Sequence, residues 1–136
     1  MKIVADAYAW VELFAGTPKG EFAKKTMEEA DAVITPGTVL AEVARKYLRE
    51  GVGEETTRKR LSTILEASEP ACVDDEVAIG AGKAYLRLEK QAREAGLRKP
   101  SLFDAVVLAV AMKNDGKVLT GDAHFEGLPN TVWMGT

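Results

Sequence analysis

The sequence predicts an α/β domain in which a mostly parallel sheet is covered by helices on both faces. Short apolar runs typical of strands alternate with longer segments of helical periodicity. Strands separated by helices require crossover connections, which favour parallel pairing. No internal repeat or low-complexity segment interrupts the alternation. With 136 residues, the chain is expected to form a single domain over 1–136 that is large enough to bury a core.

The expected elements begin with a strand and end with two strands. Helices occupy most of the sequence between them. Strands are predicted at residues 2–5, 31–35, 70–73, 117–120 and 131–134. Helices are predicted at residues 7–15, 19–30, 37–50, 54–67, 75–95 and 102–114.

Local signals in the first half support these boundaries. The apolar run after Lys2 ends at Asp6, which is a candidate N-cap for the first helix. Thr17 before Pro18 is a typical helix start, and Thr35 before Pro36 repeats that pattern.

In the second half, Cys72 lies in a predicted strand and is expected to be a buried thiol. Residues 75–95 carry one apolar stripe at helical spacing. Ser101 and Asp104 have the spacing of a capping box. The helix that follows them is apolar almost all round, which predicts a buried helix.

Four acidic residues stand out by position, and each also has a purely structural explanation. Asp6 and Asp122 follow predicted strands, but they could serve as an N-cap and a turn residue. Asp104 opens the apolar helix, where capping and metal binding are compatible. Glu42 could form an ordinary surface pair with Lys46, four residues later.

Taken together, the four acids predict a metal site. Ligands in open parallel sheets bind outside the carboxyl ends of the strands, where Asp6 and Asp122 are expected. Carboxylates gathered there would raise each other's pKa, and Mg²⁺ or Mn²⁺ would relieve the repulsion. Such ions activate water and orient phosphates. Removing the four acids from the formal net charge of −3 leaves +1, so the net charge excludes no nucleic-acid partner.

Basic residues form two groups. The first group lies on the third and fourth predicted helices: Arg45, Lys46, Arg49, Arg58, Lys59 and Arg60. Of these, Arg45, Lys46 and Arg49 share one helix face with Glu42 and are candidates for RNA binding. A second group lies on the long helix and in the loop after it: Lys83, Arg87, Lys90, Arg93, Arg98 and Lys99. Solvated helix faces are the alternative for both groups. His124, the single histidine, is predicted to be a turn residue, with an auxiliary role near the cleft as the alternative.

Composition indicates a soluble, cytoplasmic protein. The start of the sequence is too soon interrupted by charge to be a signal peptide. The longest uncharged apolar run, Ala105–Met112, is far shorter than the ~20 residues of a transmembrane helix. One cysteine allows no internal disulfide and no cysteine-based metal site.

The four acidic segments resemble those of the PIN-domain ribonucleases, specifically the VapC-like toxins of prokaryotic type II toxin–antitoxin pairs. Ile3-Val4-Ala5-Asp6 is similar to the first strand and its aspartate, and Val39-Leu40-Ala41-Glu42 to the helical glutamate. The stretch from Leu102 to Ala109 is similar to the third acidic segment. Thr120-Gly121-Asp122-Ala123-His124-Phe125 matches the family's T-x-D-x-x-F element.

The resemblance implies a three-layer α/β/α domain with a five-stranded parallel sheet. It also implies a divalent-metal-dependent endoribonuclease. Asp6, Glu42, Asp104 and Asp122 would be its catalytic metal ligands, and Thr120 a supporting hydroxyl. A cognate small antitoxin and a homodimer are further implications.

Three alternatives follow. One is a housekeeping RNA-processing nuclease of the same fold, and another is a non-catalytic interaction module whose acids serve structure. The third, a phosphoryl-transfer domain, is disfavoured. Tyr8 stands where a phosphatase would need a second aspartate. A receiver-like phosphoacceptor domain would have Lys-Pro directly after a strand, whereas Lys99-Pro100 leads into a predicted helix.

Overall fold

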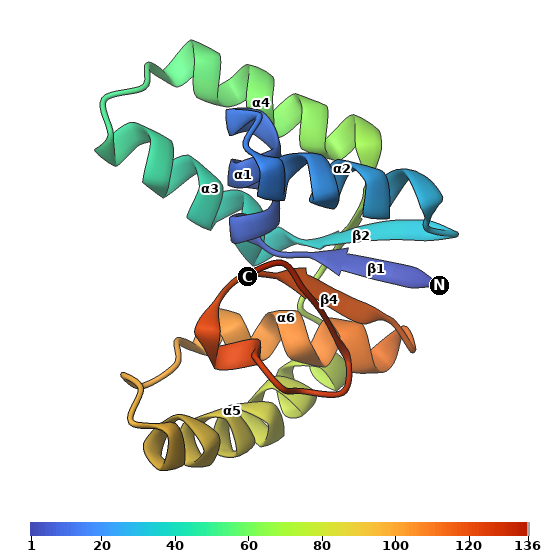
Figure 1. Ribbon diagram of the computed structural model, residues 1–136, viewed down its shortest axis with the longest axis vertical. Helices are drawn as coiled ribbons and strands as arrows, with labels where there is room; N and C mark the ends of the chain where they lie inside the picture. The colour runs from blue at the N-terminus through green and yellow to red at the C-terminus, as the bar shows by residue number, and fades with distance from the viewer. Residues whose placement is uncertain (136) are drawn as a thin grey trace.

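The computed structural model describes residues 1–135, which form a five-stranded parallel sheet of order β3-β2-β1-β4-β5 (Figure 1). The strands are β1 (Lys2–Ala5), β2 (Ala32–Pro36), β3 (Glu69–Ala71), β4 (Lys117–Thr120) and β5 (Thr131–Trp133). Every pairing is parallel. The predicted α/β class and all five predicted strands are confirmed to within two residues.

Helices cover both faces of this sheet, as the alternation of elements predicts. Among the described residues they are α1 (Ala7–Ala15), α2 (Pro18–Glu29), α3 (Gly37–Arg49), α4 (Glu54–Ala67), α5 (Asp75–Ala95) and α6 (Leu102–Lys113). In Figure 1, α1 and α2 lie on one side of the sheet, and α6 with α5 lie on the other. Helices α3 and α4 form a hairpin at the top of the view in Figure 1, and α4 contacts β2 and β3.

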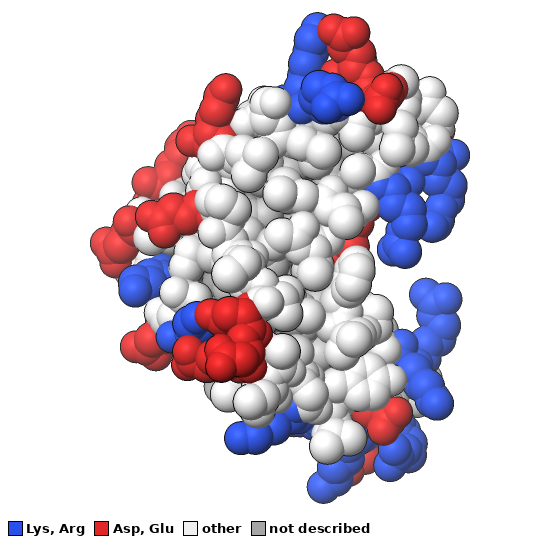
Figure 2. Space-filling view, turned by 180° about the vertical axis from the view of Figure 1, so that it is seen from behind, with Lys and Arg blue, Asp and Glu red and all other residues white. Residues whose placement is uncertain are grey.

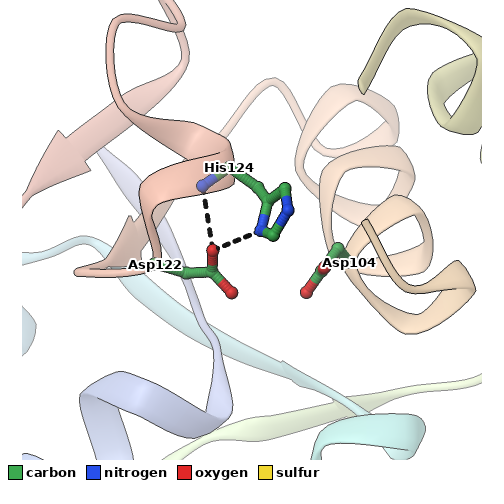
Figure 3. A group of neighbouring side chains, drawn as sticks. All are labelled: Asp104, Asp122 and His124. Carbon is green, nitrogen blue, oxygen red and sulfur yellow. Dashed lines mark hydrogen bonds and ion pairs between the residues drawn. The ribbon is translucent and has the colours of Figure 1, made fainter. Parts of the chain in front are cut away.

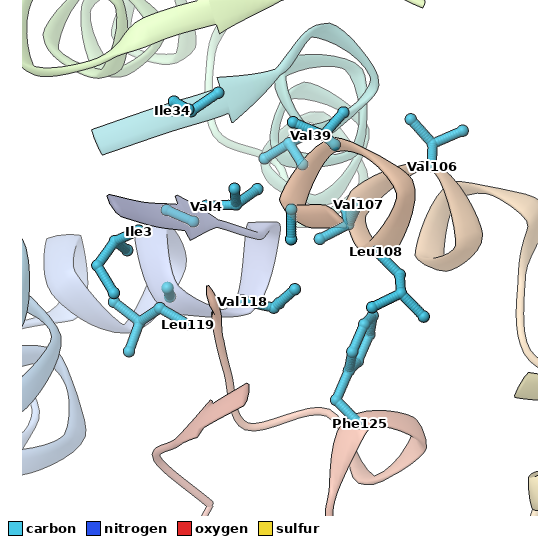
Figure 4. Close-up of a cluster of buried hydrophobic side chains, with 14 of the residues drawn as sticks. Ile3, Val4, Ile34, Val39, Val106, Val107, Leu108, Val118, Leu119 and Phe125 are labelled. Carbon is cyan, nitrogen blue, oxygen red and sulfur yellow. The ribbon is translucent and has the colours of Figure 1, made fainter. Parts of the chain in front are cut away.

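The core is built mainly from the three central strands and α6 (Figure 4). Every residue of α6 from Ala105 to Ala111 is buried, which explains why this helix has no polar face. Ile3 and Val4 of β1 and Val118 and Leu119 of β4 are fully buried. Residues buried on both faces are expected in the central strands of a parallel sheet.

Three predicted helix caps are confirmed. Asp6 accepts a hydrogen bond from the Ala9 amide at 3.0 Å. Thr17 caps α2 in the same way through the Gly20 amide. Ser101 and Asp104 form the reciprocal capping box that their spacing predicts.

Thr35 is not a helix cap, so that prediction is wrong. Its hydroxyl is buried, where it accepts a hydrogen bond from Trp10 Nε1 at 3.2 Å and lies 2.7 Å from the Ser68 hydroxyl. The indole N–H needs an acceptor inside the core, and Thr35 provides it. Thr35 thus links α1 with β2.

Cys72 is exposed, contrary to the prediction of a buried thiol. The strand β3 ends at Ala71, so Cys72 falls in the loop beyond the sheet edge. Separately, no helix within residues 1–135 combines the length and apolar character needed to cross a bilayer.

Helices α1 and α2 approach so closely at Gly20 that no side chain fits there. A Cβ on Gly20 would overlap the Glu12 carbonyl oxygen and would lie 3.0 Å from Leu13 Cα. We therefore expect Gly20→Ala to lower the unfolding free energy by about 2 kcal/mol or more, because backbone must move. Urea unfolding measures this.

The matched control is Gly82→Ala on α5, where an added Cβ meets nothing within 4 Å. Alanine is the better helix former, so this variant should gain roughly 0.5–1 kcal/mol. Equal effects of the two substitutions would contradict the close packing of α1 against α2.

Candidate metal centre

The sheet topology brings Asp6 and Asp122 to the same edge. Strands β1 and β4 are parallel neighbours, with Ala5 opposite Leu119. Asp6 directly follows β1, and Asp122 follows β4 after one glycine. Chain segments that leave neighbouring parallel strands at their carboxyl ends lie side by side, so both carboxylates occupy one end of the sheet.

Asp6 is the most buried of the four acids, with 7% of its surface exposed. Burial raises the pKa of this carboxyl group to about 7, and the charges of Asp122 and Glu42 add to the increase. Hydrogen bonds from the Thr120 hydroxyl and the Ala9 amide act in the opposite direction. At neutral pH, the carboxylate form of Asp6 is therefore costly without a cation.

Asp104, Asp122 and His124 form a close group (Figure 3). One possible ligand atom from each residue lies within 4.8 Å of the others. Asp104 comes from the first turn of α6 and faces Asp122 across the gap (Figure 3). Burial raises the pKa of Asp104, and the Asp122 charge contributes to the increase.

Glu42 lies on α3 outside this close group, but its charge reaches the other acids. The pKa of Glu42 is raised to about 7, mainly by burial and next by the charge of Asp104. The alternative surface pair with Lys46 is not formed, because Lys46 Nζ binds Glu50 at 2.9 Å. Glu42 is half-buried and belongs electrostatically to the acidic group.

Thr120 connects two of the acids. This hydroxyl is fully buried at the end of β4 and accepts a hydrogen bond from the Asp122 amide at 2.9 Å. The same hydroxyl also acts on Asp6, because it lowers the pKa of that carboxyl group against the effect of burial. Thr120 therefore orients the chain at Asp122 and one carboxylate of the site, which suits the supporting position expected for it.

His124 contacts the acidic group directly and is not only a turn residue. Its Nδ1 lies 2.7 Å from Asp122 Oδ1, and its Nε2 lies 2.8 Å from the carbonyl oxygen of Arg98. Burial lowers the pKa of the imidazole, but the Arg98 carbonyl and Asp122 outweigh this effect and raise it overall. In the sequence, the position of His124 two residues after Asp122 is compatible with a contact between these two side chains. It gives no indication of the contact with Arg98, which is distant in the chain.

The donor set suits a hard divalent cation. Carboxylate oxygens are the ligands that Mg²⁺ and Mn²⁺ favour, and a dication would reverse the unfavourable desolvation and repulsion of Asp6, Glu42 and Asp104. His124 is not available as a ligand in this arrangement, because both ring nitrogens are engaged in hydrogen bonds.

Basic side chains flank the acidic centre. Figure 2 shows a hollow at one edge of the molecule with Lys and Arg atoms on both sides and acidic atoms between them. Arg45 and Arg49 are exposed on α3, on the same helix as Glu42. Arg60, by contrast, already has a partner within the protein, because its guanidinium stacks 4.4 Å from the centre of the Tyr47 ring.

Solved structures of similar fold cover nearly the whole chain. A toxin–antitoxin complex from Klebsiella pneumoniae is 20% identical with a TM-score of 0.68, covering 97% of each chain. VapC20 of Mycobacterium tuberculosis, described as a toxin that cleaves the sarcin–ricin loop, is 20% identical with a TM-score of 0.71, covering 94% of this chain and 95% of its own. VapBC-1 from nontypeable Haemophilus influenzae is 13% identical with a TM-score of 0.71, covering 100% of both.

At these identities the structural likeness establishes the fold, which is that of VapC toxin proteins. No curated protein sequence matches the chain at a significant level. The sequence profile of the PIN domain matches residues 3–130, almost the full length of the chain. The segments that carry all four acids lie within that match, and the chain belongs to the PIN domain family.

Proposed function

We propose that this protein is an endoribonuclease that depends on Mg²⁺ or Mn²⁺ and cleaves phosphodiester bonds in RNA. The observation that carries the proposal is the group of four carboxylates at one end of the sheet, three of them with raised pKa values. Clustered, partly buried carboxylates lower the stability of a protein, and a bound cation would offset that loss.

In this proposal, Asp6, Asp104, Asp122 and Glu42 hold the cation, which supplies an activated water and stabilises charge on the phosphate when bound. Thr120 holds the backbone at Asp122 through its hydroxyl and favours the charged form of Asp6. The exposed side chains of Arg45, Lys46 and Arg49 hold the RNA backbone beside the acids. Without them, an anionic substrate would be repelled by the acidic centre.

We further propose that the nuclease is the toxin of a toxin–antitoxin pair, acts in the cytoplasm, forms a homodimer and is neutralised by a small antitoxin. Support comes from the structural relatives, several of which are described as VapBC or toxin–antitoxin complexes. A housekeeping ribonuclease of the same fold is the second candidate. An adjacent small open reading frame whose product binds this protein and stops cleavage would favour the toxin.

Asp6→Asn tests the proposed site directly. Asparagine keeps the N-cap acceptor for Ala9 but removes the charge, so the fold should persist while RNA cleavage in Mn²⁺ falls by roughly 100-fold or more. Cleavage of total RNA, with mapped ends, measures this. EDTA should abolish cleavage by the unchanged protein.

The control is Asp115→Asn, an exposed residue at φ 52° where asparagine is well tolerated. It should cleave RNA at the wild-type rate. Undiminished cleavage by Asp6→Asn, with the same ends, would exclude the proposed site.

The stability of the folded protein should also depend on pH through Asp6. Because the folded pKa of Asp6 is about 7 and its ordinary value is 3.8, the folded state binds more protons than the unfolded state between these values. The unfolding free energy in EDTA should therefore fall as pH rises from 5 to 7.5, with Asp6 contributing of the order of 2–4 kcal/mol. Urea unfolding across this range measures the slope.

Asp6→Asn should flatten this slope and be more stable than the wild type at pH 7.5 in EDTA. Saturating Mn²⁺ should stabilise the wild type at pH 7.5 more than the variant, because the cation binds the folded carboxylates. A wild-type stability that rises from pH 5 to 7.5 in EDTA would contradict the burial of an ionisable group in the site.

A further inference from the structure

The loop between α5 and α6 carries two exposed basic residues, Arg98 and Lys99. Both ends of this loop are well anchored. Gly96 ends α5 in the left-handed conformation, and the Leu97 amide donates to the Ala92 carbonyl at 2.8 Å. At the other end, Ser101 caps α6. The segment between these anchors owes its position to other contacts.

His124 provides the contact that holds the middle of the loop. A carbonyl oxygen only accepts hydrogen bonds, so His124 Nε2–H donates to Arg98 O, at 2.8 Å. Within residues 1–135, this is the hydrogen bond that ties Arg98 or Lys99 to another element. The other side of the ring is fixed by Asp122 at 2.7 Å. The imidazole thus spans from the acidic centre to the loop.

The loop and helix α3 lie on opposite sides of the acidic centre. In Figure 1, the C-terminal half of α3 and the loop after α5 project on the same side of the molecule, above and below the carboxyl ends of the strands. Basic atoms line both sides of the hollow seen from behind in Figure 2. A polyanion crossing the acids would meet α3 on one side and this loop on the other.

We propose that His124 is a positioning residue that holds Arg98 and Lys99 at the rim of the acidic centre, where they bind the backbone phosphates of single-stranded RNA. The inference deepens the proposed function and rests on it. Because the hydrogen bond is made to the Arg98 backbone, both side chains stay free for phosphate. The same ring also fixes the position of the loop relative to Asp122, because it bonds both.

Two substitutions of His124 separate the two hydrogen bonds. A glutamine amide reaches about as far as Nε2 and retains a donor for Arg98 O, whereas an asparagine amide reaches only as far as Nδ1 and retains the Asp122 contact. In EDTA, which blocks cleavage, His124→Asn should weaken binding of a labelled single-stranded RNA by roughly threefold to tenfold. His124→Gln should stay within about twofold of the wild type.

Amide hydrogen exchange provides a readout that does not involve RNA. Exchange of the Leu97 amide, which donates to Ala92 O, should speed up in His124→Asn and remain near the wild-type rate in His124→Gln. Unchanged exchange in His124→Asn would overturn the positioning role, whether or not the protein is a nuclease. Failure of the wild type to bind RNA while exchange behaves as expected would instead overturn the phosphate-binding role and weaken the proposed function.

A combined variant tests whether His124 acts through the loop. Arg98→Ala/Lys99→Ala should weaken RNA binding and lower the salt slope by about 0.7 per lost contact, and adding His124→Asn should then cost little more. Lys90→Ala/Arg93→Ala on α5 removes the same charge and should have the smaller effect. Additive losses, or equal losses in the two double variants, would overturn the proposal.

Discussion

The crowding of carboxylates at the carboxyl end of the sheet is the constraint on which the rest of the site depends. Parallel pairing of β1 with β4 sets Asp6 beside the segment of Asp122, and the buried helix α6 delivers Asp104 to the same place. Burial and mutual repulsion raise the pKa of Asp6 and Glu42 to about 7. Stability alone would favour apolar or neutral residues at these positions. Acids there lower the stability of the fold, which is typical of a functional site.

Ordinary helix-capping chemistry orients two of these acids. Asp6 caps α1 and Asp104 completes the capping box of α6, so each carboxylate is held by backbone amides near the start of a helix. An acid in a first turn interacts favourably with the helix dipole, which offsets part of the repulsion. Capping and cation binding therefore do not compete. A cap aims the side chain, and an oxygen that is not used for capping remains free for a ligand.

The charge distribution matters more than the net charge. A formal charge of −3 gives no hint of a polyanionic substrate, yet Figure 2 shows a hollow with acidic atoms inside it and basic atoms on both sides. Several of those bases have local partners. Lys46 pairs with Glu50, and Arg60 stacks on Tyr47. Arg45, Arg49 and the loop after α5 are therefore the more informative part of the basic surface.

The sequence by itself determined the order of the elements, the parallel sheet and three helix caps, because periodicity and capping act over a few residues. It also singled out Asp6, Asp104 and Asp122 by their places beside apolar runs, whereas Glu42 depended mainly on the resemblance to the PIN-domain ribonucleases. It could not decide whether Glu42 pairs with Lys46, why Thr35 is polar, or what His124 contacts. Those answers depend on segments far apart in the chain: Trp10 meets Thr35, and His124 meets Arg98. Only the tertiary structure brings such partners together, because their contacts arise from crossover topology and packing and leave no local pattern.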